Sequence, residues 1–329
     1  MPRHQLHPRA ARTGAVLTLA GAAALSLGAC GSQNATANTM PTLTVGFVVD
    51  PSWAQIPVAA QAGLFKAAGV NVKVVNFSTG PQALQALEAG QVDVTTSADV
   101  PVAAVLAHAA TMKIIADGSR WKGSVVVANR AAGISSAATL RGKSIGTPLG
   151  TSAAYFAATF LSTAGTSAKL VNVDPSAMVT AMQQDNVPAV SVFQPYQQQV
   201  ISALGKQALV LKPGPGAYVQ QSLILASTQA IHTKAAALKD FETALARAST
   251  SLAKETPSAV TAVSSATQLS PALVKAILPQ FDYRVELPQS LSGQLTALGS
   301  WAKKVGNLSG GVKLPDYAGA IDRSFLPAA

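Results

Sequence analysis

The sequence has few of the groups that enzyme active sites and covalently braced domains need. One cysteine, Cys30, stands among 329 residues, so no internal disulfide can form. Only two of the four histidines, His108 and His232, lie outside the N-terminal leader discussed below, and neither is near another metal ligand in sequence. A zinc site needs three or four ligands together, and the Gly-x-Ser-x-Gly pattern of a nucleophile elbow is absent. These absences argue against an enzyme, and we expect no cofactor and no metal.

Aromatic residues make up 5% of the chain and charged residues 12%. The formal charge is +10, and removal of the three arginines of the leader leaves +7. The basic residues are scattered singly, without the stripe or interleaved aromatics that nucleic-acid binding needs, so we expect no nucleic-acid partner. The excess is either solvated surface charge or an attraction for anionic ligands or lipid surfaces.

The N-terminus has the features of an export signal. Arg3, Arg9 and Arg12 precede the apolar run 14–30, which is short for a membrane span and ends in Leu-Gly-Ala-Cys. This ending resembles a bacterial lipobox, in which the cysteine is acylated. We therefore expect a signal peptide over 1–29, lipidation at Cys30 and a lipid anchor on the outer face of the cytoplasmic membrane. The alternative is a plain signal peptide with an incidental cysteine. Residues 30–42 are rich in Ser, Asn, Thr and Gly and predict a flexible tether.

The folded part alternates strand-like and helix-like segments. Apolar runs at 42–49, 70–77 and 92–97 are separated by a helical period over 52–69, opened by a Ser52/Gln55 capping box, and by a helix that begins at Gly80-Pro81. This alternation is typical of βαβ units.

The same order of elements recurs from residue 142 onward, with landmarks offset by 94 to 100 residues. The matching landmarks are Val45-Gly46 with Ile145-Gly146, Asn76 with Asn172, Ala86 with Ala181, Val92 with Val187, and Pro101 with Pro195. The sequence therefore predicts an α/β protein of two lobes, each a mainly parallel sheet flanked by helices. Because ligands bind beyond the carboxyl ends of parallel strands, we expect a ligand cleft between the lobes, lined by the turns that follow their strands.

One such turn, Gly150-Thr151-Ser152, combines free N–H groups, two hydroxyls and a helix N-terminus, which suits an anion. Its alternative role is a helix cap. Asp50 and Asp99 either cap helices or contact a ligand, and the aromatic residues near the strand ends either line a pocket or pack in the core. Those aromatic residues are Trp53, Phe193, Tyr196 and Tyr218.

Three stretches resemble a known family. The segment "AGLFKAAGVNVKVVNFSTGPQALQALEAGQVDVTTSADVP" is similar to the first-lobe signature of the substrate-binding proteins of ABC transporters of the nitrate, sulfonate and taurine type. "LRGKSIGTPLGTSAAYF" and "VFQPYQQQ" are similar to its second-lobe signature. The resemblance implies a two-lobed type II periplasmic-binding-protein fold, which closes over a small anionic or zwitterionic solute and delivers it to a membrane permease. It also implies a monomer.

The resemblance places ligand contacts in the turns of both lobes. In the first lobe these are Val49, Asp50, Ser52, Trp53, Ser78, Thr79, Gly80, Ser97, Ala98 and Asp99. In the second they are Gly150, Thr151, Ser152, Phe193, Gln194 and Tyr196, to which the cleft argument adds Thr147, Trp121 and Tyr218. Gln194 replaces the glutamate usual in the family, so the substrate of a relative does not transfer to this chain. A thiamin-precursor-like or other aromatic solute, a sensor lobe and an enzyme on the same fold remain the alternatives.

The chain is expected to cross between the lobes at 116–136 and 212–227. This gives lobe I as 43–120 plus 220–329, including the C-terminal helices, and lobe II as 121–219. Arg120, in the first crossing, either provides the counter-charge for an anionic ligand or is a solvated surface arginine.

Overall fold

The computed structural model describes residues 40–327. The expected signal peptide, the lipidation site at Cys30 and most of the expected tether therefore lie outside the described residues. Within 40–327, no helix combines the length and the hydropathy needed to cross a membrane.

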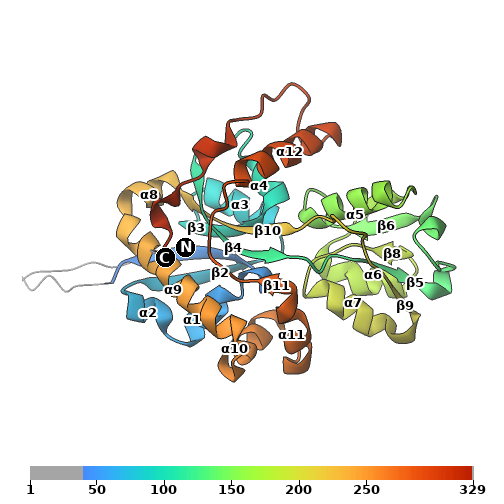
Figure 1. Cartoon of the computed structure of the whole chain (residues 1–329), viewed down its shortest axis with the longest axis horizontal. Helices are drawn as coiled ribbons and strands as arrows, with labels where there is room; N and C mark the ends of the chain where they lie inside the picture. The colour runs from blue at the N-terminus through green and yellow to red at the C-terminus, as the bar shows by residue number, and fades with distance from the viewer. Residues whose placement is uncertain (1–39, 328–329) are drawn as a thin grey trace, which may run out of the picture. The chain divides into compact units, whose positions relative to one another are not determined.

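The described chain contains two mixed sheets (Figure 1). The six-stranded sheet has the order β11-β4-β10-β3-β1-β2, and the five-stranded sheet has the order β7-β6-β8-β5-β9. The strands of the first are β1 Thr42–Val48, β2 Asn71–Phe77, β3 Val94–Ala98, β4 Met112–Trp121, β10 Gln220–Ser227 and β11 Phe281–Asp282. Those of the second are β5 Val126–Asn129, β6 Ser144–Thr147, β7 Lys169–Asn172, β8 Ala189–Val190 and β9 Ala208–Leu211. We call each sheet with its helices lobe I and lobe II, respectively.

The predicted duplication is confirmed by the strand register. In lobe I, Gly46 of β1 pairs with Val75 and Thr95, and the next residue along β1 pairs with Asn76. In lobe II, Gly146 of β6 pairs with Val171 and Val190, and the next residue pairs with Asn172. The matched glycines Gly46 and Gly146, and the matched asparagines Asn76 and Asn172, thus occupy equivalent positions in the two sheets.

Both of these glycines lie where a side chain would not fit. A Cβ on Gly46 would come within 2.7 Å of Thr95 Oγ1, and one on Gly146 within 3.0 Å of Val173 Cγ2. Close packing over the central parallel strand therefore selects glycine at the same register position in each lobe.

The prediction of mainly parallel sheets is corrected, because only the β2-β1-β3 and β7-β6-β8 groups are parallel. The strands that connect the lobes, β4 to β5 and β9 to β10, add antiparallel pairs to both sheets. The chain leaves the lobe I sheet at the end of β4 and returns at the same end of the sheet, where Gln220 pairs with Trp121, so β10 runs in the opposite direction. The connections span 122–125 and 212–219, inside the two stretches expected from the sequence.

Helices cover both sheets (Figure 1). Lobe I carries α1 Gln55–Gln61, α2 Leu64–Ala68, α3 Gly80–Glu88, α4 Asp99–Val105, α8 Thr228–Thr233, α9 Ala235–Ala253, α10 Pro257–Thr267, α11 Pro271–Ile277 and α12 Leu291–Lys304. Lobe II carries α5 Ser152–Thr163, α6 Met178–Gln183 and α7 Tyr196–Leu204. The C-terminal helices pack on lobe I, where α9 contacts α1 and α2, and α12 contacts α4.

The single helix expected over 52–69 is divided. A 3-10 turn, Pro51–Trp53, precedes α1, and Gly63 with φ 67° separates α1 from α2. The expected Ser52/Gln55 capping box is wrong. Asp50 is the cap instead, and the Gln55 side chain donates to the carbonyl oxygens of Gly118 and Tyr283.

Candidate functional site

A small cavity lies where the strand ends of the two lobes meet. A water-sized sphere has access to about 20 Å³ of it, the room of about one water molecule, so the lobes lie close together around the cavity. Its lining residues are Val48, Asp50, Trp53, Gly80, Ala98, Pro101 and Gln220 from lobe I, and Thr151, Ser152 and Phe193 from lobe II. Seven of these ten were expected from the sequence. The cavity lies beyond the carboxyl ends of β1 and β3, as expected for an α/β sheet.

The turn after β1 is fixed by contacts from distant segments. The backbone N–H of Ser52 donates to Asp50 Oδ1 at 2.7 Å. Ser119 Oγ donates to the carbonyl oxygen of Ser52 at 2.6 Å, and Tyr283 Oη donates to that of Pro51 at 2.8 Å. These bonds satisfy the buried backbone of the turn, so the cavity wall is held in one conformation.

Gln220 joins the two lobes across the cavity. Its Nε2 donates to Ser52 Oγ at 3.3 Å, and its Oε1 accepts from Ser152 Oγ at 2.5 Å. The side chain is 2% exposed. Both polar ends of one amide are therefore used to connect the first turn of lobe I to the first turn of α5.

The N-terminus of α5 forms the lobe II side of the cavity. Gly150, with φ 78°, turns the chain into the helix, and Thr151 Oγ1 donates to the carbonyl oxygen of Pro148 at 2.6 Å. The hydroxyl protons of Thr151 and Ser152 are thus used within the protein. What this turn offers a ligand is its first backbone N–H groups, which have no acceptor within the helix.

Asp99 is buried beside the cavity and has several donors. Tyr218 Oη and the backbone N–H groups of Gln221 and Val100 all donate to its carboxylate. Burial raises the pKa of Asp99 to about 7 against these bonds, which lower it. Tyr218 in turn packs edge-on against Tyr155 of α5, with ring centroids 4.9 Å apart. Asp99, at the start of α4, is therefore bonded to the end of the connection 212–219 and to the start of β10. Neither Asp99 nor Tyr218 lines the cavity.

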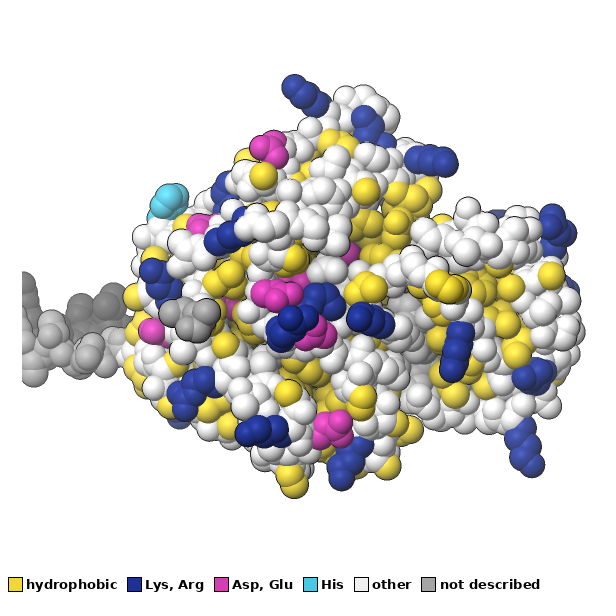
Figure 2. Space-filling view, in the orientation of Figure 1, with side chains coloured by type: hydrophobic (Ala, Val, Ile, Leu, Met, Phe, Trp, Pro, Cys, Tyr) yellow, Lys and Arg dark blue, Asp and Glu magenta, His cyan; other side chains and the backbone are white. Residues whose placement is uncertain are grey.

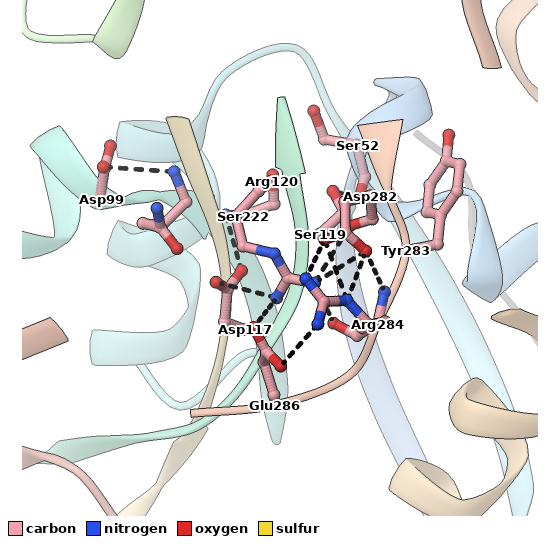
Figure 3. Close-up of polar contacts among 12 residues, drawn as sticks. Ser52, Asp99, Asp117, Ser119, Arg120, Ser222, Asp282, Tyr283, Arg284 and Glu286 are labelled. Carbon is pink, nitrogen blue, oxygen red and sulfur yellow. Dashed lines mark hydrogen bonds and ion pairs between the residues drawn. The ribbon is translucent and has the colours of Figure 1, made fainter. Parts of the chain in front are cut away.

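The expected role of Arg120 as a counter-charge for a ligand is corrected by its contacts (Figure 3). Its guanidinium lies 3.4 Å from Asp117, 3.2 Å from Asp282 and 3.2 Å from Glu286, and it also donates to the carbonyl oxygens of Asp282 and Arg284. Its charge is neutralised by the protein's own carboxylates. In Figure 3, Asp99 lies apart from this cluster.

Trp121 also has a structural environment. It is 2% exposed, stacks on Phe281 with ring centroids 5.8 Å apart, and donates its Nε1–H to Gln280. The ligand contact expected of Trp121 is therefore corrected, because its ring packs against β11.

The other expected residues do not line the cavity. Ser97 and Thr147 are fully buried, and Ser97 lies so close to Gly80 that a Cβ there would come within 2.3 Å of its hydroxyl oxygen. Tyr196 packs edge-on against Phe193 at 5.9 Å. Gln194 is 1% exposed, and its Nε2 has no hydrogen-bond partner in the described structure. Of the remaining three, Ser78 is exposed, while Val49 and Thr79 are half-buried.

Gln220, Pro101 and Val48 line the cavity and were not expected from the sequence. Gln220 stands in the predicted second crossing, in the polar pair Gln220-Gln221 that precedes an apolar strand. Two adjacent glutamines at the point where the chain returns to lobe I could have indicated a polar contact at the cavity.

Two sheets of repeated topology, with a cavity between their strand ends, define this chain as a two-lobed α/β protein of the periplasmic-binding-protein fold. A sequence profile of the family described as NMT1/THI5 like matches residues 50–273, and the chain belongs to this family.

Similar proteins of known structure include binding proteins for oxyanions and sulfonates. The alkanesulfonate-binding protein SsuA of Xanthomonas axonopodis pv. citri, bound to MOPS, aligns with a TM-score of 0.75 at 20% identity, over 86% of this chain and 98% of that one. The nitrate-binding protein NrtA of Synechocystis PCC 6803 aligns with a TM-score of 0.69 at 12% identity, over 86% of this chain and 85% of that one. At these identities the likeness shows the fold.

Among curated sequences, a protein of Brucella abortus (strain 2308), whose name describes it as a candidate binding protein, is 31% identical over 165 residues. The alignment covers 49% of this chain and 50% of the relative. The match thus spans about half the length of the curated relatives.

Proposed function

We propose that this protein is the solute-binding component of an ABC importer, which captures a small anionic or zwitterionic solute between its lobes and delivers it to a membrane permease. The observation that carries the proposal is the cavity between the lobes, lined from both sides by turns that follow strands. Sulfonate- and nitrate-binding proteins share the fold, which supports a solute of this class. A role as a binder and not as an enzyme is supported by the sulfonate- and nitrate-binding proteins that share the fold.

The proposed organisation follows from this role. Lobe I comprises 43–120 plus 220–329, lobe II comprises 121–219, and the connections 122–125 and 212–219 act as the hinge. A ligand favours the closed form only by its differential affinity for it. Gln220, which bonds Ser52 in one lobe and Ser152 in the other, stabilises the closed arrangement. A lipid anchor at Cys30 holds the monomeric protein on the outer face of the membrane, near its permease.

An aromatic solute of the thiamin-precursor type is the second proposed function. It is favoured by Trp53 and Phe193, which line the cavity from opposite lobes. Two aromatic walls are suited to a planar ring.

The test of solute binding uses the N-terminus of α5. We expect the Thr151→Ala/Ser152→Ala double variant to lose about tenfold or more in affinity for whichever solute stabilises the wild-type protein, equivalent to about 1.4 kcal/mol. The physical reason is the loss of the Ser152–Gln220 bond and of the turn that aims the first N–H groups of α5. A thermal-shift screen with sulfonates, carboxylates, nitrate, phosphate esters and pyrimidines identifies the solute, and calorimetry then measures the affinity.

The matched control changes the same two residue types at the other end of the same helix. Ser162 and Thr163 are exposed at the C-terminus of α5, so Ser162→Ala/Thr163→Ala should leave the affinity unchanged. Equal affinities for the wild type and the Thr151/Ser152 variant would contradict the proposed site. A protein stabilised by no member of the screen would contradict solute binding itself.

A further inference from the structure

Asp50 places a buried carboxylate without a cationic partner at the cavity. Its oxygens accept from the backbone N–H of Ser52, and the Ser52 side chain also bonds to it, but none of the ion pairs among the described residues includes Asp50. Asp50 is only 2% exposed and lines the cavity. Burying an ionised carboxylate without a partner is costly, so its presence at this position requires an explanation.

Capping does not explain why Asp50 is buried, because the same tripeptide occurs elsewhere on the surface. Asp174-Pro175-Ser176 repeats Asp50-Pro51-Ser52, and Asp174 Oδ1 accepts from the N–H of Ser176 at 2.9 Å while it is exposed. A carboxylate can therefore cap this turn while it is exposed to solvent, so capping does not require the burial of Asp50. Asp50 is distinguished by the cavity that it faces.

The surroundings of Asp50 suit a positive charge. The lining includes no lysine, arginine or histidine, and Arg120 on the neighbouring β4 is already paired with Asp117, Asp282 and Glu286. Trp53 and Phe193 line the same cavity, and aromatic side chains attract cations through the negative faces of their rings. A simple anion would meet an uncompensated carboxylate here.

The rest of the lining has the opposite polarity. Gly80 begins α3, of nine residues, and Ser152 begins α5, of 12 residues. Their N-termini supply free N–H groups and the positive ends of the helix dipoles. The cavity is thus negative at Asp50 and electropositive at two helix starts.

From this arrangement we infer that the solute carries a protonated or quaternary nitrogen, which pairs with the carboxylate of Asp50 between Trp53 and Phe193. Its anionic or hydrogen-bond-accepting end lies at the N-termini of α3 and α5. The inference rests on the proposed function and narrows its solute class to small zwitterions. Burial also raises the pKa of Asp50 to about 7 against its bonds to Ser52, consistent with a carboxylate that lacks a cation until the solute binds.

The test compares probes that differ only in the amino group. Calorimetry measures the binding of taurine against ethanesulfonate, β-alanine against propanoate, and 2-aminoethylphosphonate against ethylphosphonate. We expect at least one amino-bearing probe to bind, and to bind about tenfold or more tightly than its partner. Asp50→Asn, which keeps an oxygen for the Ser52 N–H, should abolish this preference.

A matched control is Asp322→Asn. Asp322 accepts from the N–H of Ser324 at 3.0 Å, the same two-residue capping contact as that of Asp50, and does not line the cavity. This variant should keep the preference for the amino group. Thermal unfolding of both variants checks their folding, and Asp50→Asn should melt no lower than the wild type because it removes a buried charge.

The outcomes separate the inference from the proposed function. Equal binding of both members of each pair, or a preference that persists in Asp50→Asn, would overturn the inference and leave solute binding intact. Binding of the amino-free anions alone would do the same. Binding of no probe would count against both proposals.

Discussion

Replacing Arg120 with methionine is expected to lower the free energy of unfolding by about 3–5 kcal/mol, the range found when one partner of a buried ion pair is removed. Arg120 is 7% exposed and pairs with Asp117, which is fully buried. Burial raises the pKa of Asp117 to about 8, and the guanidinium opposes that rise. Without the arginine, Asp117 loses its counter-charge and the carbonyl oxygens of Asp282 and Arg284 lose a donor.

The effect should grow above pH 8. The pKa of Asp117 is about 8 in the wild type, and loss of the guanidinium raises it further, so above pH 8 only the folded variant keeps the proton that the unfolded chain has released. The free energy of unfolding of the variant then falls more steeply between pH 8 and pH 9 than that of the wild type. Urea unfolding at pH 6, pH 8 and pH 9 measures both quantities.

Arg284→Met is the matched control for this substitution. Arg284 belongs to the same cluster and pairs with Asp282, but its side chain is 72% exposed. Figure 2 shows such basic and acidic side chains gathered near the middle of one face, with other basic side chains scattered around them. Exposed pairs contribute little, so the control should change stability far less. Similar losses for the two variants would show that burial at Arg120 does not matter.

The second large effect is expected at Glu242, because this carboxylate is buried without a partner. Glu242 lies on α9, is fully buried, and neither of its oxygens has a hydrogen-bond partner in the described structure. Burial raises its pKa from 4.5 to about 8. Between these values the folded state holds a proton that the unfolded state has released, so this group's contribution to stability falls as the pH rises.

Glu242→Leu should therefore raise the free energy of unfolding at pH 8 by on the order of 3 kcal/mol, and by much less at pH 4.5. Asp50, Asp99 and Asp117 have pKa values raised in the same direction, so the wild type should remain more stable at pH 5 than at pH 8. Glu242→Leu removes only the part of this pH dependence that Glu242 causes. Urea unfolding should therefore show a shallower slope of the free energy of unfolding against pH in the variant than in the wild type.

Glu88→Leu is the control for Glu242. Glu88 lies at the exposed C-terminus of α3, so its replacement should leave the slope unchanged. Parallel curves for the wild type and Glu242→Leu, with equal stabilities at pH 8, would contradict the prediction.

The local pattern of the chain determined the elements, their order and the duplication. The alternation of apolar runs and helical periods gave the parallel cores β2-β1-β3 and β7-β6-β8, because the side-chain period is a property of each segment alone. The matched glycines and asparagines gave the register, since residues that repeat at one offset occupy equivalent positions. The turns that line the cavity followed from the rule that strand ends meet at one edge.

Tertiary structure alone decided which side chains meet across long separations. Arg120 was expected to face a ligand, yet its partners Asp282 and Glu286 come from a segment more than 160 residues away. Gln220 lies 168 residues from Ser52 and 68 residues from Ser152 in the sequence. The helical pattern around Glu242 did not indicate that its carboxylate is buried. A sequence pattern specifies which face a residue occupies. The partner that neutralises its charge or satisfies its hydrogen bonds depends on how distant segments pack, and this is why the charge of the cavity emerged only from the fold.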